Sequence, residues 1–183
     1  MHHTGTQRLK TERLTLRPLQ ANDAEAMFHN WAGDPKVTKY LSWPTYKSVM
    51  DAKLFLQNRV ANYPNKNFYD WGIVLTQSQT LIGTISVVAH DDQVKSMEIG
   101  YCIGQAFWGH EYVKEAFKAV IQYLFENTDV NRIEARHDTH NPNSGKVMQK
   151  CGLQFEGVLR QAHRNNQGIV DDAVYAILRQ DYE

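Results

Sequence analysis

Residues 98–117 read Glu-Ile-Gly-Tyr-Cys-Ile-Gly-Gln-Ala-Phe-Trp-Gly-His-Glu-Tyr-Val-Lys-Glu-Ala-Phe. Apolar side chains alternate at positions 97, 99, 101 and 103, which predicts a strand over 96–103. The strand pattern ends at Gly104, and a helical pattern begins near His110 after a turn. A helix start leaves backbone N–H groups unpaired at the positive end of the helix dipole, which favours a phosphate or pyrophosphate. Most junctions of this kind bind nothing, so the prediction of an anion site depends on a second segment.

That second segment reads Asn141-Pro-Asn-Ser-Gly-Lys-Val-Met-Gln-Lys-Cys-Gly-Leu-Gln-Phe-Glu-Gly. Together the two segments resemble the GNAT N-acetyltransferases, in the branch of the ribosomal-protein N-terminal acetyltransferases (RimJ/RimL-like). The matching positions are Glu98–Tyr101, Trp108–Tyr112, Glu115, Ala116, Asn141, Ser144, Lys150, Gly152, Leu153, Glu156 and Gly157. The opening at 11–19 and the closing at 159–168 also resemble the ends of family members, so the resemblance spans nearly the whole chain.

Hydrophobic periodicity predicts the element order βααβββαβαββ, which indicates a single mixed α/β domain. We expect strands over 13–19, 69–75, 80–89, 96–103, 132–137, 154–162 and 169–178, and helices from 22 or 23 to 31, 48–63, 110–127 and 143–151. Residues 34–46 are expected to form a loop able to overhang a cleft. The resemblance implies a GNAT fold whose mixed central sheet splays between the strands at 96–103 and 132–137 around an acyl-CoA cleft. We assign residues 1–10 to an N-terminal extension and 11–183 to the acetyltransferase domain.

The resemblance implies that acetyl-CoA is the co-substrate. We expect it to be bound by Ile103, Trp108, Gly109, His110, Glu111, Tyr112, Asn141, Ser144 and Lys150. Within this set, the family implies that Asn141 bonds the pantetheine arm and that Ser144 faces the thioester sulfur as a hydrogen-bond donor. An alternative role is helix capping, with Asn143 or Ser144 opening the helix.

Two positions depart from the family pattern. Glu111 replaces the second glycine of the loop and brings a carboxylate to the point where a phosphate approaches. Either this side chain turns away and only its N–H faces the ligand, or pyrophosphate binding is weakened. Met148 stands where many members of the superfamily carry a tyrosine that protonates the leaving thiolate, so that role cannot be assigned to tyrosine here.

An alkylamine acceptor is protonated at neutral pH, so acetyl transfer needs a route for its proton. Glu98 is one candidate base, because it projects from a predicted central strand where burying a carboxylate is costly. His163 is the second, because it follows Gln161-Ala162 at a point where the ribosomal-protein branch carries a glutamate implicated as base. The alternatives are a solvated glutamate and a surface histidine at a hairpin end.

The sequence favours neither a covalent acyl-cysteine nor a histidine metal site. Cys102 lies in a predicted central strand with no sign of a paired base, so we interpret it as a small buried residue rather than an acyl carrier. The eight histidines are scattered and form no pair of zincin type, so we expect no metal site.

Composition excludes several classes of protein. The 183 residues balance 20 Lys and Arg against 20 Asp and Glu, which argues against a nucleic-acid partner held by a broad basic surface. No apolar stretch is long enough for a membrane span, no signal peptide opens the chain, and two cysteines suit a reducing compartment, so we expect a cytoplasmic protein.

The first hypothesis is therefore an N-acetyltransferase in which a primary amine attacks the thioester directly. The amine belongs either to a protein N-terminus or to a small molecule such as a polyamine or an antibiotic. A non-catalytic acyl-CoA-binding module and a cofactor-free peptide- or ribosome-binding domain are the alternatives, and a homodimer is left open.

Overall fold

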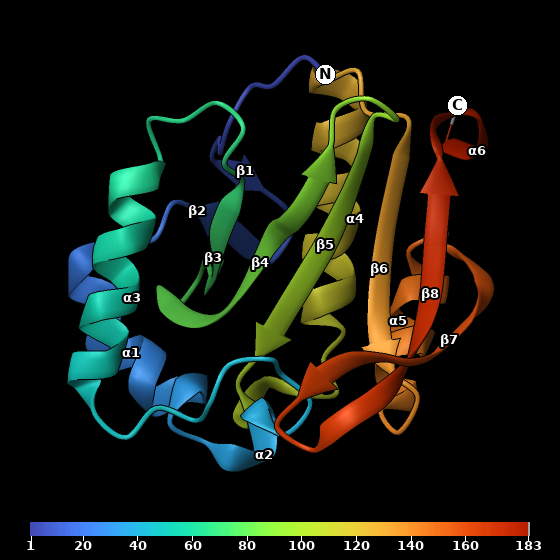
Figure 1. Cartoon of the computed structure of the whole chain (residues 1–183). Helices are drawn as coiled ribbons and strands as arrows, with labels where there is room; N and C mark the ends of the chain where they lie inside the picture. Colours follow the sequence, from blue (N-terminus) through green and yellow to red (C-terminus); the bar gives the residue numbers. More distant parts are fainter. Residues whose placement is uncertain (183) are drawn as a thin grey trace.

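The computed structural model describes residues 1–182 and contains one eight-stranded mixed sheet with helices on both faces (Figure 1). The strands follow the spatial order β1-β2-β3-β4-β5-β6-β8-β7. Their bounds are β1 Leu9–Lys10, β2 Leu14–Arg17, β3 Asp70–Leu75, β4 Thr80–Asp91, β5 Ser96–Ile103, β6 Arg132–Asp138, β7 Gln154–Asn165 and β8 Gly168–Leu178.

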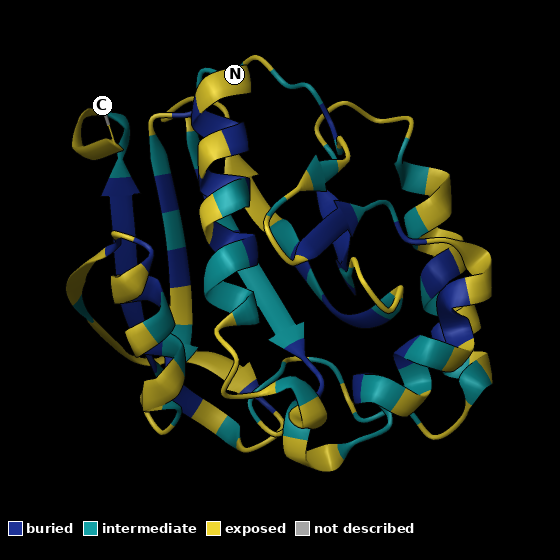
Figure 2. Cartoon of the chain, turned by 180° about the vertical axis from the view of Figure 1, so that it is seen from behind, coloured by how far each residue is buried: buried dark blue, intermediate teal, exposed yellow. Residues whose placement is uncertain are grey.

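The helices divide between the two faces of this sheet. Their bounds are α1 Ala24–Met27, α2 Pro35–Thr38, α3 Val49–Asn62, α4 Tyr112–Asn127, α5 Pro142–Lys150 and α6 Arg179–Tyr182. Two buried clusters result, one beneath α4 that includes Trp71 and Phe117, and one beneath α1 and α3 that includes Trp31 and Leu56. Seen from behind, α4 carries buried stripes toward the sheet and exposed ones toward solvent (Figure 2). Because helices cover both faces of the sheet, the central strands are rich in apolar residues.

The predicted strands and long helices are confirmed, with local differences at their ends. The helix predicted from position 22 or 23 begins with a 3₁₀ turn and ends with a π-helical turn, Phe28–Ala32. The predicted loop at 34–46 contains the short helix α2, because the Asp34 carboxylate accepts from the N–H of Lys36 as a cap. The prediction that Asn143 or Ser144 opens a helix is wrong, since Pro142 occupies the first helical position, which suits its fixed φ.

The parallel pair β5 and β6 splays as expected. Pairing runs from Ser96 opposite Arg132 to Ile99 opposite Ala135 and then stops, although β5 continues to Ile103 and β6 to Asp138. The two strands separate toward their C-terminal ends (Figure 1). The last residues of β5 stay paired with β4 but have no partner on the β6 side, and they lead directly into the predicted anion-binding loop.

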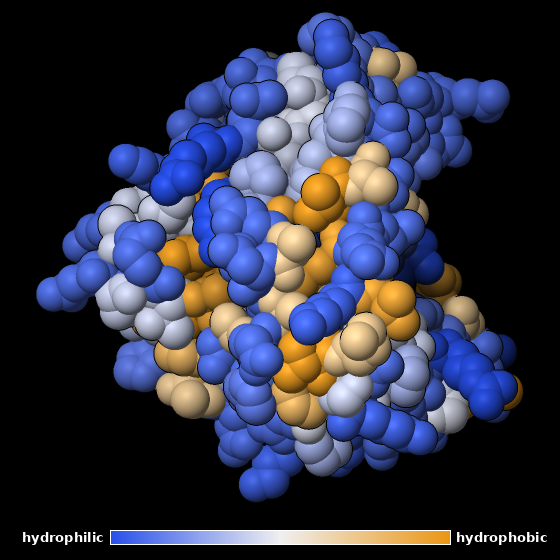
Figure 3. Space-filling view, turned by 90° about the vertical axis from the view of Figure 1, so that its left-hand side faces the viewer, coloured by the Kyte–Doolittle hydropathy of each residue, from blue (hydrophilic) through white to orange (hydrophobic). Residues whose placement is uncertain are grey.

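The molecular surface that carries α1 and α3 contains both polar and apolar side chains. Met50 and Leu54 of α3 are exposed, and the face that carries α1 and α3 shows apolar patches separated by hydrophilic side chains (Figure 3). Within residues 1–182, no helix combines the length and the hydropathy that a membrane crossing requires.

Candidate active site

The loop between β5 and α4 presents free hydrogen-bond donors. Within the described residues, the backbone N–H groups of residues 109–114 donate to no protein acceptor, and the first backbone bond of the helix runs from Glu115 to Glu111. Gly109 and Glu111 are both left-handed, with φ of +82° and +60°. Successive N–H groups around left-handed residues form a concavity that binds anions, and the α4 dipole adds positive potential there. The geometry therefore suits a pyrophosphate.

The side chain of Glu111 pairs with two lysines, one on α4 and one on α5. One carboxylate oxygen lies 2.6 Å from the ammonium of Lys114, and the other lies 2.5 Å from that of Lys150. Hydrogen bonds from these two lysines lower the pKa of Glu111 to about 2. The Glu111 carboxylate therefore holds two cations beside the loop in ion pairs, and its own backbone N–H has no acceptor among the described residues.

Side chains around the loop hold its shape. The indole N–H of Trp108 donates to the carbonyl of Ile103 at 3.0 Å, and the His110 ring stacks on Tyr112 at 5.3 Å. The guanidinium of Arg13 donates to the carbonyl of His110 at 3.0 Å and lies 4.5 Å from the centre of the Tyr112 ring. Sequence reasoning missed Arg13, which reaches this loop from the far end of the chain.

Helix α5 continues the site on the same face as α4. Asn141 donates through Nδ2 to the Ser144 hydroxyl at 3.3 Å, and the hydroxyl of the half-buried Tyr101 donates to the Ser144 carbonyl at 3.3 Å. Lys150, at the other end of α5, meets Glu111. The residues predicted to bind cofactor therefore extend along one side of the splayed strands.

Gly145 allows α5 to lie this close to the sheet. A Cβ at this position would lie 2.7 Å from Nε2 of His137 and 2.8 Å from the Tyr175 hydroxyl. Any larger residue would push the start of α5 outward, together with Asn141 and Ser144.

The two candidate bases lie together on the opposite face. Glu98 of β5 is half-buried, and its carboxylate lies 3.8 Å from Nε of Arg136 on β6. Burial raises the pKa of Glu98 despite that guanidinium. His163 of β7 is 3.9 Å from the Asp172 carboxylate on β8, and both Asp172 and His163 lie near enough to affect the pKa of Glu98. The structure therefore brings Glu98 and His163 into one polar cluster.

Asp172 is a site residue that sequence reasoning missed. It is 5% exposed, and burial raises its pKa although His163 and Arg136 stabilise the charged form. The available signal was the pair Asp171-Asp172, which interrupts the apolar run of β8.

Cys102 has no partner that would activate it. Burial raises the pKa of its thiol to about 11, and its sulfur lies 3.6 Å from the Thr84 hydroxyl. A thiol that stays protonated is a poor nucleophile, so Cys102 is poorly suited to carry an acyl group.

The segment between α2 and α3 borders this polar face. The Asn166 side chain, at the β7–β8 turn, donates at 2.8 Å to the carbonyls of Thr38 and Trp43. Tyr40 donates to the carbonyl of His140, just before α5, at 3.2 Å. Residues 38–43 therefore join the α1 and α3 side of the molecule to the far end of the sheet.

The acetyltransferase (GNAT) domain model matches residues 13–154. This chain belongs to the GNAT acetyltransferase family. The match includes β5, the donor loop, α4, β6 and α5, so the family assignment covers the elements that form the candidate cofactor site.

Relatives of this GNAT acetyltransferase extend the similarity over most of the chain. "Uncharacterized N-acetyltransferase YoaA" of Bacillus subtilis is 35% identical over 171 residues, which is 93% of this chain and 96% of that protein. "Ribosomal-protein-serine acetyltransferase" of Escherichia coli is 27% identical over 137 residues, 74% of this chain and 75% of that protein. These similarities are consistent with the ribosomal-protein branch.

A solved structure shows the same fold. "RimL- Ribosomal L7/L12 alpha-N-protein acetyltransferase in complex with Coenzyme A" superposes with a TM-score of 0.84, covering 94% of this chain and 98% of that one at 19% identity. At this identity the likeness concerns the fold alone.

Proposed function

We propose that this GNAT acetyltransferase transfers the acetyl group of acetyl-CoA directly to a primary amine. The observation that carries the proposal is the row of free N–H groups at residues 109–114, placed where β5 and β6 separate. The coenzyme A complex of a protein with the same fold gives it further support.

The donor would bind on the α4 and α5 side. Its pyrophosphate would accept from the N–H groups of residues 109–114, with Trp108, His110 and Tyr112 shaping the loop. Its pantetheine arm would pass Asn141, and the Ser144 hydroxyl would donate to the thioester sulfur as the thiolate leaves. Backbone donors and a hydroxyl that are held in place before reaction cost no reorganisation when charge develops.

The amine would approach from the opposite face, where Glu98 lies. A carboxylate whose pKa is raised by burial accepts a proton more readily than a solvated one, so Glu98 is our first choice as base. His163, beside Asp172, is the second. The acceptor is a protein N-terminus or a small amine, and residues 38–43 would shape its entry.

We further propose that residues 11–183 form the catalytic domain in the cytoplasm and that residues 1–10 are an extension packed on it. The extension is anchored where the Tyr123 hydroxyl donates to the Gly5 carbonyl at 2.7 Å, and its last two residues form β1, the edge strand that pairs with β2.

Coenzyme A binding tests the donor site. A ligand that binds only the folded state at a hundredfold excess over Kd stabilises it by ~2.7 kcal/mol, so saturating coenzyme A is expected to raise Tm clearly. The matched variant is Gly109→Ala, because its Cβ would touch nothing within 4 Å and acts only through the left-handed backbone. We expect this variant to lose most of the shift. An unchanged Tm in the native protein would overturn the proposal.

Thiol release with a panel of N-terminal peptides, polyamines and amino-group antibiotics then tests transfer. A melting shift without turnover on any amine would support the non-catalytic acyl-CoA-binding module instead. Turnover on peptides alone or on small amines alone identifies the acceptor class.

A further inference from the structure

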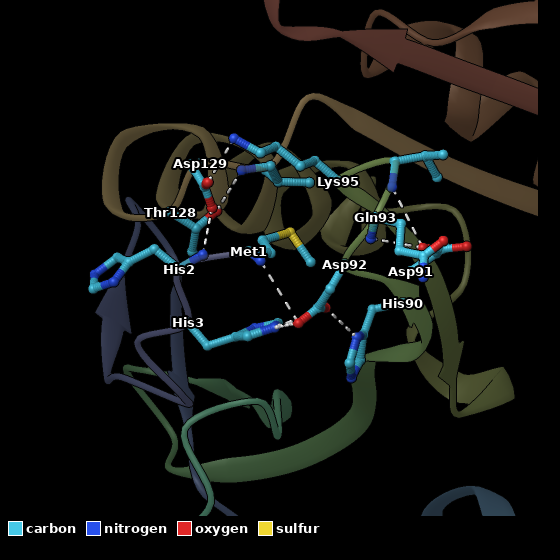
Figure 4. A network of polar contacts seen from close by, with 12 residues as sticks. Met1, His2, His3, His90, Asp91, Asp92, Gln93, Lys95, Thr128 and Asp129 are labelled. Carbon is cyan, nitrogen blue, oxygen red and sulfur yellow. Dashed lines mark hydrogen bonds and ion pairs between the residues drawn. The ribbon is translucent and has the colours of Figure 1, made fainter.

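Two histidines and one aspartate meet at the end of β5 that is far from the donor loop. Here the N-terminal segment crosses the turn between β4 and β5 (Figure 4). Nε2 of His3 lies 3.1 Å from a carboxylate oxygen of Asp92, and Nδ1 of His90 lies 2.9 Å from the same oxygen. One ligand atom from each of the three residues falls within 4.8 Å of the other two. The cluster therefore already has the spacing of a metal site.

The His3 ring is fixed from behind. Its Nδ1 lies 3.1 Å from the Tyr69 hydroxyl, which also accepts from the N–H of Thr4 at 3.0 Å. The His3 side chain is only 11% exposed, and its ring contacts that of His90 edge-on at 5.0 Å. A partner on the second ring nitrogen is what orients metal-bound histidines, so Tyr69 directs Nε2 of His3 toward Asp92.

We propose that His3, His90 and Asp92 bind a divalent transition-metal ion, with zinc as the best fit. Nε2 of His3, Nδ1 of His90 and one Asp92 oxygen would be the protein ligands, with water in the fourth position. Two imidazole nitrogens disfavour magnesium and calcium, which take oxygen ligands. Zinc binds the unprotonated nitrogen of an imidazole, so a proton carried by either ligand nitrogen goes to solvent on binding.

The ion would join the N-terminal segment to the β4–β5 turn. Other charges at this corner include the Met1 amino group, 3.7 Å from Asp92, the pair between Lys95 and Asp129 at 2.8 Å, and Asp91, whose carboxylate accepts from the N–H of Gln93 at 2.8 Å (Figure 4). None of them competes for the ligand nitrogens. Because the turn precedes Ser96 and the donor loop follows Ile103, the whole length of β5 separates this site from the acetyl donor. Zinc is therefore expected to raise Tm while leaving acetyl transfer unchanged.

Calorimetric titration of the full chain, without an affinity tag and stripped of metal, tests the proposal with zinc chloride as the probe. We expect one zinc per chain, and a Kd at least about tenfold weaker in both His90→Ala and Asp92→Asn, because losing a ligand should cost no less than losing an outer-shell partner, which costs about 10–100-fold in metal affinity. His29→Ala is the matched control, because His29 also pairs with a carboxylate, Glu25 at 3.1 Å, but lies outside the cluster. This control is expected to bind zinc like the native chain.

Cobalt absorption and melting with chelator complete the test. Tetrahedral cobalt bands in the native chain that are lost in Asp92→Asn would support the site. A variant whose Tm in chelator equals that of the native chain is correctly folded. If His90→Ala does not fold, Asp92→Asn alone tests the site, because asparagine keeps the shape of the aspartate side chain. Equal zinc affinity in the native chain and in either folded cluster variant would overturn the proposal.

Discussion

Replacing Glu111 with glycine is expected to tighten the binding of coenzyme A. The carboxylate now holds the ammonium groups of Lys114 and Lys150 at 2.6 and 2.5 Å, beside the loop whose N–H groups would bind a pyrophosphate. Glu111→Gly removes a like charge from the phosphate site and frees two ammonium groups. Unit charges ~4 Å apart in water interact by about 1 kcal/mol, or roughly fivefold in an equilibrium constant. Two freed lysines, less the cost of ordering their side chains, give an expected gain in affinity of about tenfold.

Titration calorimetry with coenzyme A, at low salt and at 1 M salt, measures this effect. The gain should largely disappear at 1 M salt, where the screening length falls to about 3 Å. Glu111→Ala separates charge from backbone, because it removes the carboxylate but keeps a non-glycine residue at φ +60°. If both variants bind coenzyme A more weakly than the native chain, the carboxylate preorganises the lysines for the phosphates, and our interpretation of the loop is refuted.

Three further predictions concern the rest of the molecule. Glu98→Gln should lower kcat by about 10²–10⁴-fold, as for loss of a general base. Because burial raises the pKa of Glu98, the same variant should raise the free energy of unfolding at neutral pH, and urea melts should show this gain vanishing below about pH 4. A comparable loss of kcat in His163→Ala instead would assign the base to histidine. Gly145→Ala should destabilise the fold by about 1–3 kcal/mol through overpacking, since its Cβ would lie 2.7 Å from His137. Because the start of α5 would shift, the variant should also raise the KM for acetyl-CoA. An unchanged KM would show that α5 takes no part in binding the donor. Burial raises the pKa of Asp70 to about 7, although the Arg59 guanidinium 3.1 Å away favours the charged form. The contribution of Asp70 to stability is therefore present below about pH 4 and is lost as pH rises through 7. Relative to Asp70→Asn, the native chain should lose stability between those limits, and parallel pH–stability curves would contradict this.

Local patterns in the sequence were sufficient to predict the elements that form the donor side of the site. The alternation over 96–103, the break at Gly104 and the helical pattern that follows are all properties of neighbouring residues, so β5, the loop and α4 were predictable. The left-handed conformation of Glu111 was not, because residues other than glycine seldom adopt it and tertiary contacts impose it here. Its two lysine partners lie on different helices, which spacing alone cannot relate.

The acceptor side depended on contacts between distant strands. Glu98 was identified from its place on a predicted strand and His163 from the resemblance. Asp172, which pairs with His163 and repels the charge of Glu98, lies on β8 and became visible only once the strands were paired. The scatter of histidines along the chain led us to expect no metal site. Spacing along the sequence cannot detect a cluster formed by His3 and the β4–β5 turn, because chain folding alone brings them together.

The contacts of Asn166 make residues 38–43 and the β7–β8 turn a matched pair. Its side chain bonds the carbonyls of Thr38 and Trp43, and its N–H bonds the carbonyl of Leu41 at 3.1 Å. A chimera that takes only one of these two segments from another acetyltransferase would lose that fit, whereas one that takes both would keep it. An engineered change of amine selectivity would therefore require replacing both segments, residues 38–43 and the β7–β8 turn. Among related acetyltransferases, changes in one segment should be accompanied by changes in the other.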